Sequence, residues 1–89
     1  MRDKEKILKY IGERCRRFRR ERGLTMAEAA EQADISVRTL EAYELGEREM
    51  STPTAIKLAE IYRTTLTQLT NYRHALDDLG IEINRRTKE

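Results

Sequence analysis

Residues 26–45 have the sequence MAEAAEQADISVRTLEAYEL, in which two short segments have helical periodicity. The small residues of the first segment fall on one helical face: Ala29, Ala30 and Ala33. The larger apolar residues that follow point back toward this face: Ile35, Leu40 and Tyr43. We therefore predict two closely packed helices that leave an outward row of side chains: Val37, Arg38, Glu41 and Ala42.

Two capping residues mark where these helices begin. Thr25 precedes the first segment with Glu28 three residues later, which is the pattern of a capping box. Ser36 stands in the same position before the second segment. The turn between the helices is then only about three residues long, as in a helix-turn-helix, whose second helix lies in the DNA major groove. A plain helical hairpin in an all-α domain fits the same pattern.

From about Ile11 to Leu69 the chain resembles the Cro and phage-repressor (XRE-like) type of helix-turn-helix protein. The resemblance rests on four segments: IGERCRRFRRERGLT, AEAAEQADIS, TLEAYELG and AIKLAEIY. It implies an all-α, five-helix, lambda-repressor-like DNA-binding domain with an extended C-terminal helix. We accordingly expect a single domain over residues 1–89, with its motif at residues 26–45.

The resemblance also implies roles for individual residues. Arg19 and Glu44 lie where the family has an ion pair between its first and third helices, and the family's core positions fall on Ala30, Ile35 and Leu40. The base-facing positions lie on the third helix: Val37, Arg38, Thr39, Glu41 and Ala42. Phosphate contacts are expected from Thr25, Met26, Ser36 and Arg48. Arg38 either donates to a guanine edge or holds a phosphate.

Three residues depart from the family pattern. Asp34 stands at the corner where the family usually has Gly, and Asp tolerates the left-handed conformation at a modest cost. Met26 stands where Gln often opens the second helix, and Met50 where Pro often follows the third.

The charge is distributed unevenly along the chain. Residues 1–22 carry ten Lys or Arg and four Asp or Glu, whereas residues 23–49 carry two and seven. An acidic motif is unexpected for DNA binding, because phosphate neutralisation supplies much of the affinity. It favours the alternative of an antitoxin-like or adaptor protein-interaction module. Four arginines of the first helix are either a basic flank for DNA or a solvated face: Arg14, Arg16, Arg17 and Arg20.

The C-terminal third has an apolar stripe that continues past the resemblance. After Thr65 the stripe consists of Leu66, Leu69, Tyr72, Leu76 and Leu79. We predict a dimerisation helix over residues 66–79, followed by a polar tail at 84–89. The expected interface comprises Leu69, Tyr72, Leu76, Leu79 and Ile81. Alternatively, this helix folds back over the first helix, which carries Ile7, Leu8 and Tyr10. In the preceding helix, the residues expected to face inward are Ala55, Ile56, Ala59 and Tyr62.

Composition restricts the function further. The single cysteine, Cys15, falls on the apolar stripe of the first helix, and His74 has no Cys or His at ligand spacing. We therefore expect no metal, no cofactor and no enzymatic activity. Without an apolar run of membrane-spanning length, a cytoplasmic protein with no membrane contact is expected.

These observations together predict a sequence-specific DNA-binding regulator that acts as a homodimer on a palindromic operator. Repression by occupancy is the expected mode, because so short a chain leaves no room for a separate effector domain. A dimer would cover two half-sites about 34 Å apart. The partners to consider are double-stranded DNA, a second copy of the chain and a protein antagonist.

Overall fold

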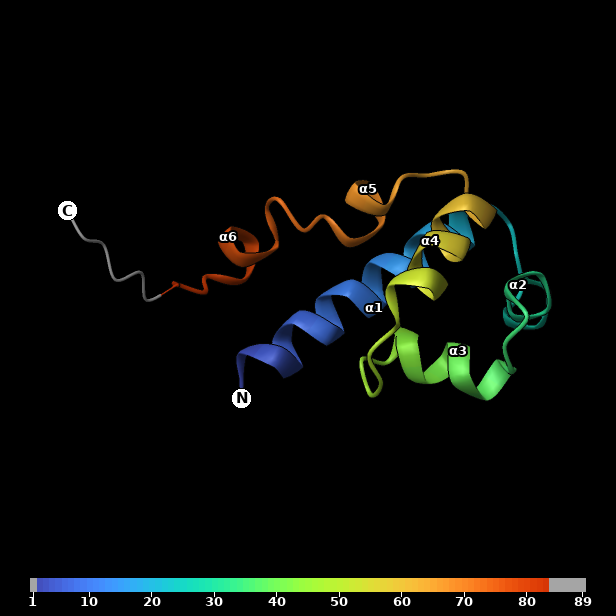
Figure 1. Cartoon of the computed structure of the whole chain (residues 1–89), viewed down its shortest axis with the longest axis horizontal. Coiled ribbons are helices and arrows are strands. Elements are labelled where there is room, and N and C mark those ends of the chain that lie inside the picture. Colours follow the sequence, from blue (N-terminus) through green and yellow to red (C-terminus); the bar gives the residue numbers. More distant parts are fainter. Residues whose placement is uncertain (1, 84–89) are drawn as a thin grey trace.

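The computed structural model describes residues 2–83, which form six α-helices and no strand (Figure 1). The helices are α1 (Asp3–Glu21), α2 (Met26–Ala33), α3 (Val37–Glu44), α4 (Thr52–Ile61), α5 (Leu66–Thr70) and α6 (Ala75–Leu79). The predicted all-α fold is confirmed. None of these helices is long and apolar enough to span a membrane. The predicted tail at 84–89 lies outside the described residues.

The long helix α1 is the element around which the others are arranged. Helices α2, α3 and α4 lie around its C-terminal half, and the segment containing α5 and α6 runs back along it (Figure 1). Apart from one large side chain, that of Tyr62, the core is built from small and medium-sized residues: Cys15, Ala29, Ala30, Ala33, Leu40, Leu58, Ala59 and Leu69. Two of the core positions implied by the resemblance, Ala30 and Leu40, are buried, and the third, Ile35, packs against them.

Cys15 lies in this core as the apolar periodicity of α1 predicts. Its side chain is fully buried, and burial raises the pKa of its thiol to about 12, with the nearby Glu44 carboxylate adding to the effect. The thiol therefore stays protonated at neutral pH. A protonated thiol without access to solvent acts as a small apolar group rather than as a nucleophile.

The predicted C-terminal helix is divided into α5 and α6. Asn71 adopts a left-handed conformation with φ 51° and ends α5, and Asn tolerates this conformation better than most residues. Its side-chain Nδ2 donates a hydrogen bond to Tyr10 Oη at 2.7 Å, and Tyr10 Oη donates to Asp78 Oδ2 at 2.6 Å. These bonds hold the segment against α1, which is the fold-back alternative considered above.

Two expectations for individual apolar residues are wrong. Leu69 is 0% exposed within one copy, so it belongs to the domain core and offers no surface to a dimer partner. Ile56 is 53% exposed, and Leu58 is buried instead. The reason is helical geometry: the buried positions 55, 58, 59 and 62 share one face of α4, whereas position 56 is turned about 100° away from position 55.

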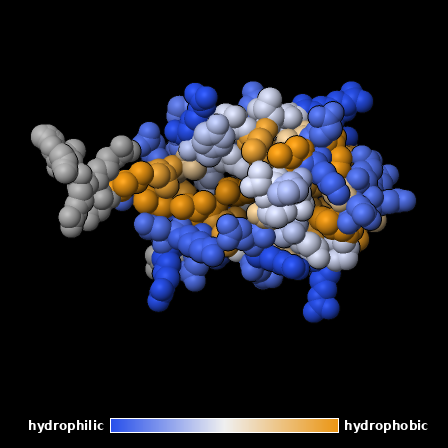
Figure 2. Space-filling model, viewed as in Figure 1, coloured by the Kyte–Doolittle hydropathy of each residue, from blue (hydrophilic) through white to orange (hydrophobic). Residues whose placement is uncertain are grey.

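Hydrophobic residues are not confined to the core. Figure 2 shows a band of them beside the C-terminal end of the described chain, continuing toward the centre of the molecule between charged margins. The large apolar side chains with the greatest exposure in the C-terminal segment are Tyr72 and Ile83.

Helices α1 and α3 approach each other closely at Gly12. A Cβ atom placed on Gly12 would lie 2.5 Å from the Tyr43 carbonyl oxygen and 2.6 Å from that of Glu44. Both atoms belong to the backbone of α3, so neither can rotate away. The absence of a side chain at Gly12 therefore sets how closely the last turn of α3 lies against α1.

Replacing Gly12 by alanine tests this packing. Alanine in an open helix position would stabilise α1 by about 1 kcal/mol. Here we expect Gly12→Ala to lower the free energy of unfolding by about 1 to 3 kcal/mol instead, because the added methyl group forces α3 away from α1. Urea unfolding followed by circular dichroism measures the change. Glu13→Ala, at the exposed neighbouring position, is the matched control and should leave stability nearly unchanged; equal stability of both variants would contradict the steric constraint.

Candidate nucleic-acid interface

The starts of α2 and α3 are fixed by their capping residues. Thr25 Oγ1 accepts a hydrogen bond from the Glu28 amide at 3.0 Å, and Glu28 Oε1 accepts one from the Thr25 amide at 2.9 Å. Ser36 Oγ accepts a hydrogen bond from the Thr39 amide at 3.0 Å. These are the bonds that the sequence predicts. Each helix therefore begins at a defined residue, with its first amides near the surface.

The turn between the two helices depends on Asp34. This residue ends α2 in the left-handed conformation, with φ 59° and ψ 44°. The amide of Ile35 then donates to the Ala30 carbonyl at 3.0 Å, and α3 begins two residues later. The corner is thus as short as predicted, with an acidic residue where glycine would cost least.

The surface of α3 divides into a buried and an outward side. Leu40, Tyr43 and Glu44 are buried, whereas Val37, Arg38 and Glu41 are exposed. Thr39 and Ala42 are half-buried beside them. The Thr39 hydroxyl accepts a hydrogen bond from Ser36 Oγ at 2.9 Å, which ties it to the cap. Of the five expected base-facing side chains, three therefore project fully.

One residue of the outward side is absent from the predicted row. Leu45 follows the last turn of α3, four residues after Glu41, and is 44% exposed. Leu45 shares one helical face with Val37, Arg38 and Glu41. The helical periodicity of the sequence is therefore enough to predict that Leu45 faces outward.

A buried ion pair fixes α3 against α1. Arg19 Nε donates to Glu44 Oε2 at 2.7 Å, and Arg19 Nη2 donates to Glu44 Oε1 at 3.1 Å. Arg19 Nη1 also donates to the Leu24 carbonyl at 2.9 Å, in the segment before α2. The hydrogen bonds to the Glu44 carboxylate raise the pKa of Arg19 above its ordinary value. The expected pair is thus bidentate, and it connects three segments of the chain.

The expected phosphate contacts have different surroundings. Thr25, Ser36 and Arg48 are exposed. The Met26 side chain packs against the core, which leaves its backbone amide at the start of α2. A phosphate there would be held by amides of a helix N-terminus.

The charges around α3 are partly compensated within the chain. Glu28 caps α2, Glu44 pairs with Arg19, and Glu49 Oε1 lies 3.2 Å from Lys4 Nζ. Lys4 and Glu49 are far apart in the sequence, and folding brings the start of α1 to the loop after α3. Because both side chains of this pair are exposed, the pair contributes little to stability. Glu31, Asp34, Glu41 and Glu47 are exposed without an ion pair among the described residues.

The arginines of α1 do not form one uniform flank. Arg16, Arg17 and Arg20 are exposed. Arg14 instead donates to the Leu69 carbonyl at 3.3 Å, and its guanidinium lies 5.7 Å from the centre of the Phe18 ring. Arg14 therefore holds the end of α5 against α1 and is not available as part of a basic surface.

Comparison with known proteins identifies related sequences and structures. The helix-turn-helix family model matches residues 16–69. The crystal structure of the clp gene regulator ClgR from Corynebacterium glutamicum is similar, with a TM-score of 0.69 and 22% sequence identity. The similarity covers 83% of this chain and 86% of that one. No curated protein matches the chain at a significant level.

Removing one partner of the buried pair should destabilise the whole domain. We expect Glu44→Ala to lower the free energy of unfolding by about 3 to 5 kcal/mol, because the Arg19 charge is left buried without its partner. Thermal unfolding followed by circular dichroism measures this loss. Glu31→Ala, an exposed glutamate of α2, is the control and should change stability by less than about 0.5 kcal/mol. A melting temperature for Glu44→Ala close to that of the parent would contradict the role of the pair.

A series at the corner residue tests the cost of its conformation. We expect Asp34→Gly to raise the free energy of unfolding by about 1 kcal/mol, because glycine adopts positive φ without steric cost. Asp34→Ala should lower it, since alanine gains no local hydrogen bond in that conformation. Urea midpoints of the three proteins give the order. An alanine variant as stable as the glycine variant would show that the left-handed conformation costs nothing here.

Proposed function

Because the chain belongs to the helix-turn-helix family, whose members bind DNA and regulate transcription, we propose that it is a sequence-specific repressor that binds a palindromic operator as a homodimer. The observation that carries this proposal is the geometry of α3. Its buried side is fixed to α1 through Glu44, its start is capped by Ser36, and its outward side is exposed. A rigid helix with a free face is what entry into the major groove requires.

Sequence recognition falls to the outward side chains of α3. Arg38 donates to the O6 and N7 atoms of a guanine, which is worth about 1 to 3 kcal/mol of discrimination. Val37 contributes apolar contact with thymine methyl groups, and Leu45 extends that contact at the other end of the helix. Glu41 accepts a hydrogen bond from a cytosine amino group. Thr39 and Ala42 lie between these groups and contribute less surface.

Phosphate contacts set the register of the domain on DNA. The starts of α2 and α3 present backbone amides beside the hydroxyl groups of Thr25 and Ser36, and such amides bind phosphate without side-chain charge. Arg48 adds a cation in the loop after α3. The exposed carboxylates nearby reduce non-specific attraction, so binding depends on the matched sequence more than on charge alone.

Repression follows from occupancy. Two copies related by a two-fold axis place their α3 helices in successive major grooves, about 34 Å apart on one side of the duplex. A polymerase cannot occupy the same stretch of promoter DNA. No additional effector surface is required for this mode of action.

The competing function is that of a protein-interaction module, and the exposed carboxylates of the motif favour it. Selection of bound sequences from a random pool of duplex DNA distinguishes the two. The repressor proposal expects enrichment of a palindrome with two half-sites. Failure to enrich any sequence at low salt would overturn it in favour of a protein partner.

Substitution of Arg38 tests how sequence is recognised. Arg38→Ala should relax the preference at one base pair in each half-site, with a loss of about 1 to 3 kcal/mol that applies only to the preferred base. Binding is measured on the selected operator and on variants at that base pair. Lys57→Ala, which removes one exposed positive charge from α4, is the control and should leave the preference intact. An equal loss of affinity on all sequences would instead assign Arg38 to a phosphate. In that case the slope of log affinity against log salt concentration should also become shallower by about one.

A further inference from the structure

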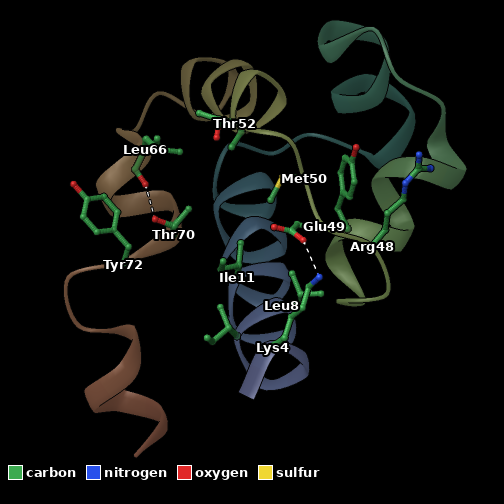
Figure 3. Close-up of a pocket in the computed structure, with 13 residues that line it drawn as sticks. Lys4, Leu8, Ile11, Arg48, Glu49, Met50, Thr52, Leu66, Thr70 and Tyr72 are labelled. Atoms are coloured by element: carbon green, nitrogen blue, oxygen red, sulfur yellow. Dashed lines mark hydrogen bonds and ion pairs between the residues drawn. The ribbon is translucent and has the colours of Figure 1, made fainter. Parts of the chain in front are cut away.

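An open apolar groove lies between the first half of α1 and the C-terminal segment. It measures about 600 Å³, and its apolar lining includes Ile7, Leu8, Ile11, Met50, Leu66 and Tyr72. Figure 3 shows Leu8 and Ile11 of α1 at its centre, Leu66 and Tyr72 on one side, and the Lys4–Glu49 ion pair on the other. None of the outward residues of α3 lines the groove, although Arg48 in the loop after α3 lies at its edge.

A second hollow of about 460 Å³ lies beside the first. Its apolar lining comes from Leu76, Ile81 and Ile83, and its charged lining comes from Asp77 and Glu82 together with one basic residue, Arg73. Tyr72 borders both hollows and is 58% exposed. Tyr72 thus joins the two hollows into one continuous surface, which is mainly apolar in the first hollow and of mixed polarity in the second.

The two ends of this surface carry opposite charge. Residues 2–9, at the start of α1, contain four Lys or Arg and two Asp or Glu. Residues 75–83 contain three Asp or Glu and no Lys or Arg. Asp78 is engaged by Tyr10, but Asp77 and Glu82 are exposed and form no ion pair within residues 2–83. A surface with one basic and one acidic end is complementary to itself when turned by 180°.

We propose that a second copy of the chain covers this surface, so that the segment Ile81–Ile83 of each copy lies in the groove of the other. The inference rests on the proposed homodimer and specifies its interface. Because Tyr72 borders both hollows, a two-fold axis near Tyr72 places the first hollow of each copy against the second hollow of the other. Glu82 of one copy then faces Lys4 of the other. This interface keeps Tyr72, Leu76 and Ile81 from the sequence prediction, excludes Leu69 and adds α1.

The chemistry of the segment fits the groove. The segment consists of two isoleucines that flank one glutamate, so in the dimer Ile81 and Ile83 enter the apolar groove while Glu82 stays at its charged margin. A small apolar ligand would fill the first groove but leave the second hollow and Ile83 in water. A second copy covers both at once, which is why the charge pattern and the apolar surface together favour it.

Exchange of the two charges tests the contact. In Lys4→Glu and in Glu82→Lys, both symmetric contacts of the dimer become repulsive, so the dissociation constant of each variant should rise roughly tenfold or more. When the two variants are mixed, a mixed pair contains one native contact and one charge-reversed contact, and both are attractive. Sedimentation equilibrium should therefore show dimers in the equimolar mixture at concentrations where each variant alone is monomeric.

The controls are Lys57→Glu and Glu60→Lys, which change the same charges on the exposed side of α4 and should dimerise like the parent. Three results would overturn the proposal: a parent that is monomeric at tens of micromolar, single variants that dimerise as the controls do, or a mixture that stays monomeric. A monomeric parent would also remove the homodimer from the proposed function, whereas the other two results would remove only this interface. A dimeric parent that enriches a palindrome in the DNA selection but fails the charge exchange keeps its proposed function.

Discussion

The bidentate pair between Arg19 and Glu44 is the interaction on which the remaining structure depends. Two charges removed from water cost several kcal/mol, and the cost is recovered only with good geometry and additional hydrogen bonds. Here both carboxylate oxygens accept from Arg19, which also donates to the Leu24 carbonyl. Such bonds are directional. They therefore fix the orientation of α3 against α1. An apolar contact of the same area would allow more orientations.

Close packing complements this pair. Gly12 lets the backbone of α3 approach α1, and the alanine face of α2 lets α3 lie near on its other side. The core thus contains few large side chains, and Cys15 fills the space between the helices as a protonated, apolar group. At the other end of α1, polar bonds from Tyr10 to Asn71 and Asp78 hold the C-terminal segment. That segment completes the core through Leu69 but leaves a groove along α1.

Contacts within the domain explain part of the negative charge of the motif. Glu28, Glu44 and Glu49 have partners inside the domain, so part of the negative charge serves folding rather than repelling DNA. The exposed carboxylates still weaken the long-range attraction of phosphates. The proposed function therefore relies on oriented backbone amides and on a few specific side chains, and we expect low occupancy of unrelated DNA.

The sequence alone determined the features that depend on residues near one another in the chain. The caps at Thr25 and Ser36, the alanine face and the outward position of Arg38 follow from spacings of a few residues, and the family resemblance added the pair of Arg19 with Glu44. The tertiary structure decided what depends on distant segments: the pairing of Glu49 with Lys4, the engagement of Arg14 with α5, the burial of Leu69 and the break at Asn71. Periodicity shows which side of a helix is apolar, but only the packed neighbours determine whether that side is covered by the same copy or remains open.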